Sequence, residues 1–246
     1  MKKRLMGFML VFVFIAGLSL VLYPYVADAW NTYRRNTLVK DYEEKIETLK
    51  EEGKVDYSEE WEKARKYNEK VVPFDTSTNL PDPFALVSLQ KEPSKEYMDC
   101  LNIIGDGVMG YVEIPKIDVL LPIYHTDKEE VLQNAAGHME GSSFPIGGES
   151  THAIVVAHRG LPNVKLFSDL DELKEGDHFL IGVLNEVLCY EVDQIKVVEP
   201  GDIKDLSVVN GEDYVTLLTC TPYGVNSHRL LVRGHRVEYN KDVLKE

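Results

Sequence analysis

The second half of the chain consists of short apolar and β-branched runs separated by turn residues. We predict strands over residues 111–114, 119–123, 152–157, 178–183, 186–198, 214–219 and 229–238. Dipeptides such as Asp106-Gly107, Gly147-Gly148 and Asn210-Gly211 separate these runs. Many short strands without regular intervening helices are typical of a closed antiparallel or mixed β-barrel. The pattern predicts a mainly β domain over residues 100–240, one short helix around residues 164–170, and a tail over residues 241–246.

The N-terminus predicts a membrane segment. Lys2, Lys3 and Arg4 precede an apolar run over residues 5–25, which is long enough to cross a bilayer. Positive charge before the run keeps that end in the cytoplasm and exports the rest. Ala27-Asp28-Ala29 has the small-x-small form of a signal-peptide cleavage site, but the run exceeds a usual signal-peptide core. We therefore expect residues 1–27 to be a single-pass anchor in the cell membrane, with the folded domain outside.

Residues 28–72 carry two helical patterns. Apolar residues recur at helical spacing at Leu38, Tyr42, Ile46 and Leu49. After Gly53, Asp56 stands three residues before Glu59 in the manner of a capping box, and an apolar stripe follows at Tyr57, Trp61 and Ala64. We predict a pair of helices packed on the outside of the main domain.

Residues 73–99 differ from the helical region before them and from the β domain after them. Prolines recur from residue 73 to residue 93, at Pro73, Pro81, Pro83 and Pro93. Proline has no backbone N–H and a fixed φ, so a regular element is excluded there. A long irregular loop in a compact domain tends to be a lid or a linker.

Charge and cysteine content narrow the function. A net charge of -14 argues against nucleic acid as a partner, because phosphate binding needs clustered Lys and Arg. No phosphate-binding glycine loop and no clustered Cys/His site is present, so we predict neither a metal nor an organic cofactor. Three cysteines leave at least one unpaired, and an unpaired thiol in an exported chain is a candidate reactive group.

Cys220 is that candidate. It ends an apolar run just before a Pro-Tyr-Gly turn, and Arg229 opens the next run nine residues later. Pairing of the two strands would bring the guanidinium beside the thiol, and a nearby cation favours the nucleophilic thiolate. His158 ends the apolar run over residues 152–157 and is the strongest candidate for the base, with His138 as the runner-up that would line the groove. These residues predict an acyl-transfer site.

The segment TLLTCTPYGVNSHRLLVRGHR resembles the signature of the sortases, in particular the class C branch that builds pili. The segments around Gly137-His138 and Ala157-His158-Arg159-Gly160 are also similar to that family. The resemblance implies a membrane-anchored cysteine transpeptidase. Cys220 would attack an LPXTG-like sorting signal of a pilin and form a thioacyl-enzyme. His158 would transfer protons, Arg229 would stabilise the oxyanion, and an acceptor lysine of another pilin would complete an isopeptide bond.

Asp82-Pro83-Phe84 resembles the lid motif of the class C branch. The resemblance implies that Asp82 pairs with the active-site arginine and that the ring of Phe84 covers the cysteine.

Three alternatives remain from the sequence. A housekeeping sortase would attach surface proteins to the cell wall, and the lid motif argues against it. A papain-like hydrolase places its cysteine before its histidine and on a helix, whereas here His158 comes first and the setting is β. A tethered β-barrel binding module would leave Cys220 inert.

Overall fold

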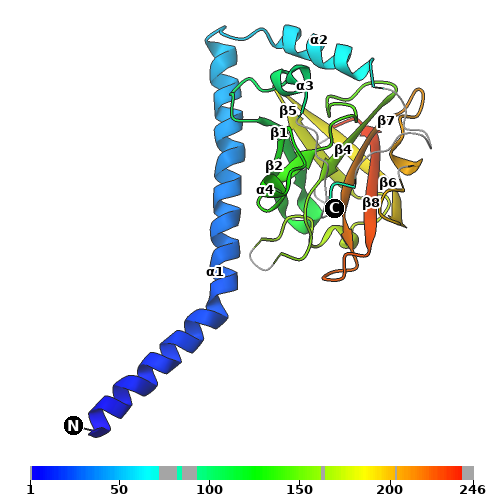
Figure 1. Ribbon diagram of the computed structural model, residues 1–246. Helices are drawn as coiled ribbons and strands as arrows, with labels where there is room; N and C mark the ends of the chain where they lie inside the picture. Colours follow the sequence, from blue (N-terminus) through cyan, green and yellow to red (C-terminus); the bar gives the residue numbers. More distant parts are fainter. Residues whose placement is uncertain (1, 72–81, 85–92, 162–163, 203, 240–246) are drawn as a thin grey trace.

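The computed structural model describes residues 2–71, 82–84, 93–161, 164–202 and 204–239 of the chain. Within these residues a closed barrel stands beside one long helix (Figure 1). The strands of the barrel are β1 (Val108–Ile114), β2 (Val119–Tyr124), β3 (Ala136–His138), β4 (Thr151–Val156), β5 (His178–Val183), β6 (Glu186–Val198), β7 (Asp213–Thr221) and β8 (His228–Val237). The mainly β fold predicted from the sequence is confirmed.

The barrel is mixed. Its strands follow the order β1-β2-β3-β4-β7-β8-β6-β5 around the closed sheet. The pairs β2/β3 and β4/β7 are parallel, and all the other neighbours are antiparallel. The parallel pair β4/β7 decides the position of the site, because parallel strands end at the same edge of a sheet.

Strand β4 is buried on both faces, which explains why residues 152–157 read as a continuous apolar run. Val155 points into the main core of the barrel, whereas Ile154 and Val156 belong to a second cluster. This second cluster contains Leu218 and Leu231 from the neighbouring strands. It forms an apolar patch on β4, β7 and β8, and Phe84 packs on it.

Helix α1 (Lys2–Glu51) is continuous from the apolar N-terminal run to its end beside the barrel. Val39, Tyr42 and Ile46 are buried against β1, and the Tyr42 hydroxyl donates to the carbonyl of Met109 at 3.0 Å. The expectation that Leu38 packs on the domain is wrong, because Leu38 is 43% exposed and Val39 takes that place. A shift of one residue turns a helical side chain by about 100°, which takes Leu38 off the buried face, whereas Tyr42 and Ile46 are buried as predicted.

Helix α2 (Tyr57–Asn68) crosses the end of the barrel that lies away from the N-terminal half of α1 (Figure 1). Asp56 caps it by accepting from the backbone N–H of Ser58 at 2.9 Å, and Trp61 and Ala64 are buried as predicted. The remaining helices are short: α3 (Lys95–Asp99), α4 (Glu129–Leu132), and the 3-10 turns Pro115–Ile117, Leu170–Glu172 and Lys204–Leu206.

The helix predicted over residues 164–170 is wrong. Leu166 has a φ of +42°, which an α-helix of L-residues does not adopt, so the segment forms turns before the 3-10 turn Leu170–Glu172. The three-residue strand β3 was also missed, because a run this short has no readable alternation. Most of the loop predicted over residues 73–99 lies outside the described residues, which here are 82–84 and 93–99. The prediction is wrong at its end, because Ser94 caps helix α3 (Lys95–Asp99) where a loop was expected.

Candidate active site at the rim of the barrel

Strand directions bring Cys220, His158 and Arg229 to one rim of the barrel. Val156 of β4 pairs with Leu218 of β7 in parallel register, so His158 and Cys220 each follow two residues later at the same edge. Strand β8 runs antiparallel to β7 and places Arg229 directly opposite Cys220. The sequence predicted the second juxtaposition from the short connection between the two strands. The juxtaposition of His158 with Cys220 depends instead on the pairing of β4 with β7, which lie far apart in the sequence.

Cys220 is more deeply buried than its place at a strand end suggested, with 4% of its surface exposed. Burial raises the pKa of its thiol to about 11. The positive charge of Arg229 opposes this shift, while the carboxylates of Asp82 and Glu129 add to it. In this arrangement the thiol is held in its protonated, less reactive form at neutral pH.

Arg229 is held from two sides. Its Nη1 donates to the backbone carbonyls of Asn226 at 3.0 Å and His228 at 2.9 Å, which fixes the plane of the guanidinium. Its Nε donates to Asp82 Oδ1 at 2.8 Å, and its Nη2 donates to Asp82 Oδ2. This paired contact has the fork geometry in which arginine binds a carboxylate most strongly. The Asp82 carboxylate therefore occupies the donors that face out of the sheet.

Phe84 joins two of the predicted site residues. Its ring centroid lies 5.2 Å from that of His158 and 5.3 Å from Cζ of Arg229. The ring also packs on the apolar patch of β4, β7 and β8. The Asp82–Phe84 segment thus contacts His158 through the Phe84 ring, and it contacts Arg229 through both the Phe84 ring and the Asp82 carboxylate.

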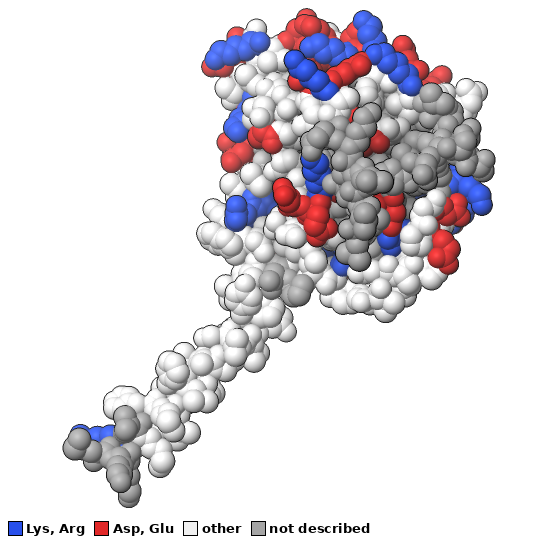
Figure 2. Space-filling model, in the orientation of Figure 1, with Lys and Arg blue, Asp and Glu red and all other residues white. Residues whose placement is uncertain are grey.

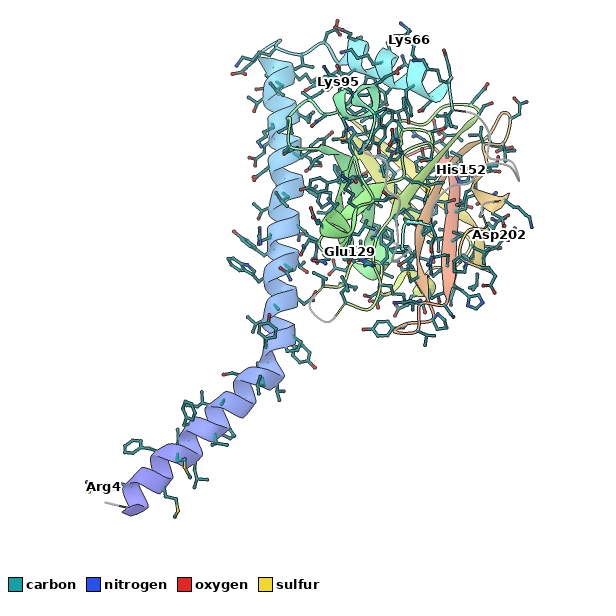
Figure 3. The ribbon with its side chains drawn as sticks, viewed as in Figure 1. Arg4, Lys66, Lys95, Glu129, His152 and Asp202 are labelled. Carbon is teal, nitrogen blue, oxygen red and sulfur yellow. The ribbon has the colours of Figure 1, made fainter. Side chains whose placement is uncertain are left out.

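His158 has an acidic partner that the sequence analysis did not find. Its Nε2 lies 2.8 Å from Oε2 of Glu129, and the side chain of Glu129 is 62% exposed. Glu129 begins α4, in the connection between β2 and β3, and lies toward the lower end of the barrel (Figure 3). Nothing in the sequence separates Glu129 from Glu130 beside it, so only the fold identifies this contact.

Arg159, which follows His158, was missed as well. Its Nη1 donates to Thr221 Oγ1 at 3.2 Å and its Nη2 contacts Asp171 Oδ2 at 2.6 Å. Its Cζ lies 5.9 Å from the ring centroid of Tyr223, and its Nε has no hydrogen-bond partner. Arg159 therefore ties the residue after Cys220 to the segment that carries His158. The Ala-His-Arg-Gly motif was the signal that could have identified it.

His138, the alternative base, does not line the groove as expected. It is fully buried, its Nε2 donates to the carbonyl of Ser143 at 2.8 Å, and its Nδ1 accepts from the Tyr97 hydroxyl at 2.8 Å. Burial lowers the pKa of His138 to about 3, so the ring stays neutral. Cys100 and Cys189 are buried free thiols away from this rim pairing. The described residues contain no group of acidic, Cys and His side chains that could hold a metal ion.

Comparisons with known proteins identify the family of this chain. The model of the sortase domain matches residues 112–237. Sortase D of Bacillus subtilis is 28% identical over 131 residues, which are 52% of this chain and 63% of that protein. The chain therefore matches about three fifths of the length of this curated relative.

Solved structures match over more of the chain. Sortase C-1 from Streptococcus pneumoniae is 44% identical with a TM-score of 0.73, and the match covers 83% of this chain and 100% of that one. The pilus-related sortase C of Group B Streptococcus is 41% identical with a TM-score of 0.72, covering 82% of this chain and 97% of that one. This chain therefore belongs to the sortase family of cysteine transpeptidases, and its fold resembles that of the class C, pilus-related sortases.

Proposed function

We propose that this chain joins pilin subunits through lysine isopeptide bonds, with Cys220, His158 and Arg229 as its catalytic residues. The observation that carries the proposal is the position of the Asp82–Phe84 segment over the rim. Its carboxylate binds the guanidinium that faces Cys220, and its ring contacts His158. Similarity to the pilus-related sortase C of Group B Streptococcus supports pilins as substrates.

The chemistry proceeds in two steps. The Cys220 thiolate attacks a carbonyl carbon of an LPXTG-like sorting signal, and Arg229 donates to the developing oxyanion. His158 gives a proton to the departing amine, which leaves a thioacyl bond on Cys220. A lysine amine of the acceptor pilin then loses a proton to His158 and attacks the thioester, which forms the isopeptide bond and restores the Cys220 thiolate and the protonated His158.

In the described arrangement Asp82 and Phe84 act as a closed lid. Asp82 saturates the outward donors of Arg229, and its charge helps to raise the pKa of Cys220. A substrate carbonyl needs those donors and a thiolate, so the lid must leave before the first step. The ring of Phe84 contributes roughly 1.5–3 kcal/mol if its burial on the apolar patch is complete, an amount that substrate binding can offset.

We further propose that α1 anchors the enzyme in the cell membrane with the barrel outside. The segment beginning at Met6 has a mean hydropathy of 2.4 over its most apolar window, and 0% of that window is buried against the protein. Protease added to cells stripped of their wall should remove the barrel. Full protection of the barrel would contradict this orientation.

Covalent assembly is the direct test. The full chain, mixed with a pilin that has an LPXTG-like signal, should produce ladders that resist boiling in detergent. Cys220→Ala should produce none, and replacement of the acceptor lysine of the pilin should stop the ladder at the thioacyl-enzyme. If the chain cleaves the signal but transfers the pilin only to cell-wall peptides, it is a housekeeping sortase and the pilin proposal is wrong.

A further inference from the structure

The turn that follows Cys220 exposes apolar side chains at the rim. Outside α1, the large hydrophobic side chains that the described residues expose are Val197, Val209, Tyr223, Val225 and Tyr239. Tyr223 is 59% exposed and Val225 is 69% exposed, and both belong to the connection between β7 and β8. The segment between these strands carries no charged residue. Two exposed apolar side chains therefore lie in the short turn that follows Cys220.

This turn is held in shape. The backbone N–H groups of Val225 and Asn226 both donate to the carbonyl of Pro222 at 3.0 Å. The ring of Tyr223 lies against Gly160, where an added Cβ would come within 3.4 Å of it. The exposed apolar groups are thus presented by a fixed turn, so their exposure is a stable property of this rim.

The rim points in the same direction as the apolar half of α1. Figure 1 shows α1 descending along the barrel from α2, with its N-terminal half continuing past the opposite end. The β7–β8 turn lies at that lower end, near the level at which α1 bends (Figure 1). A bilayer that contains the apolar half of α1 would therefore lie below the catalytic rim.

Aromatic residues of α1 mark where the surface of this bilayer would be. Tyr25, Trp30 and Tyr33 are exposed by 74%, 61% and 64%, and Trp and Tyr are enriched where membranes meet water. At a rise of about 1.5 Å per residue, Trp30 lies only about 14 Å along the helix from Val39, where α1 packs on the barrel. The barrel therefore begins close above the expected membrane surface.

The distribution of charged side chains also favours the lower end of the molecule as the one that faces the membrane. The visible face of the molecule carries dense Lys, Arg, Asp and Glu around α2, whereas its lower margin, at the rim end, is largely uncharged (Figure 2). Charged side chains resist transfer from water toward lipid, so on this face the lower margin is better suited than the α2 end to approach a bilayer.

We propose that the β7–β8 turn inserts Tyr223 and Val225 into the headgroup region of the membrane, so that the active site works at the lipid surface. The inference rests on the membrane anchoring proposed above for α1. It identifies a second membrane contact, separate from the anchor, that sets the height and orientation of the rim. Cys220 would then meet sorting signals at the point where they leave the bilayer.

Fluorescence quenching by lipid tests the contact directly. Two tryptophan probes are introduced singly into the full chain in a Trp30→Phe background. Each variant is reconstituted in vesicles of phosphatidylcholine and phosphatidylglycerol with brominated acyl chains, which quench tryptophan fluorescence. Trp61 is 8% exposed beside Asn185 and serves as an unquenched internal reference. Val225→Trp should be quenched several-fold more than Val209→Trp, whose site precedes β7 at the opposite end of that strand. Equal quenching of the two variants would overturn the proposal.

A kinetic comparison separates lipid from protein as the partner. Val225→Asp should cleave a lipid-tethered sorting peptide several-fold more slowly and the same peptide in solution at the unaltered rate. Val209→Asp should cleave both normally. An equal loss on both forms of the peptide would mean that the turn binds substrate, and would overturn the lipid contact. Flotation of the chain with the vesicles is scored separately, because its failure would reject the anchor and this inference while leaving the transpeptidase chemistry intact.

Discussion

The rim cluster around Cys220 and the buried cluster around His138 contain similar side chains but hold them differently. At the rim, Arg229 and His158 have partners on other segments, Asp82 and Glu129. In the interior, the imidazole of His138 is satisfied by Tyr97 and by the backbone of Ser143, and it is covered on one side by the ring of Phe144. Partners on separate segments can be exchanged for a substrate, whereas partners in the core are lost only when the protein unfolds.

Removing the rim groups should give the largest effect on activity. His158→Ala should lower kcat for sorting-peptide cleavage by about 10²–10⁴, because a positioned proton-transfer group is lost. Arg229→Lys should lower it by about 10²–10³, because an ammonium group cannot reproduce the fork of donors toward the oxyanion. Circular dichroism should remain unchanged. Near-normal cleavage by either variant would remove that residue from the catalytic site.

The buried histidine should affect stability instead. His138→Phe should leave the Tyr97 hydroxyl or the Ser143 carbonyl without its partner and cost about 1–3 kcal/mol of unfolding free energy. Urea unfolding measures this loss, with the half-exposed His228→Gln as the matched control. If His138→Phe abolishes peptide cleavage while unfolding at the wild-type urea concentration, His138 belongs to the catalytic chemistry and the contrast fails.

The buried histidines His138 and His152 also predict acid sensitivity. Burial lowers the pKa of His138 to about 3 and that of His152 to about 4. Below the ordinary value of 6.5 the unfolded chain binds protons that the folded chain does not, so stability should fall as the pH drops from 6.5 toward 4. In His138→Phe the decline over this range should be shallower.

Opening the lid should change the thiol more modestly. Asp82→Ala with Phe84→Ala removes a carboxylate whose charge helps to raise the pKa of Cys220 to about 11, so this pKa should fall. It also removes a ring that contacts His158 and Arg229. The pH profile of iodoacetamide labelling should shift to lower pH, with labelling at pH 8 about tenfold faster. Cys220→Ala in the same background identifies the labelled thiol. Unchanged labelling would mean that this segment does not control the cysteine.

The smallest effect is expected at Glu129. Its carboxylate is 62% exposed, so its contact with His158 is screened by water and helps mainly to orient the ring. Glu129→Gln keeps a hydrogen-bonding group and should change kcat only a few-fold, whereas Glu130→Gln next to it should have no effect. A loss as large as that of His158→Ala would place Glu129 among the catalytic groups.

The sequence by itself determined the features that depend on neighbours close in the chain. Alternating and continuous apolar runs located seven of the eight described strands, and the short connection after Cys220 placed Arg229 opposite the thiol. Along α1 the pattern identified Tyr42 and Ile46 correctly but chose Leu38 in place of Val39, because spacings of three and four residues both fit a helical stripe.

Tertiary structure decided what depends on distant segments. The parallel pairing of β4 with β7 brings His158 to the rim of Cys220, and the fold of the β2–β3 connection brings Glu129 to His158. Local pattern carries no information on these pairings, because they join residues that lie far apart in the sequence. For the same reason the sequence ranked His158 above His138 but still kept His138 as a runner-up at the groove. Only the closing of the barrel buried one histidine in its core and left the other at the edge.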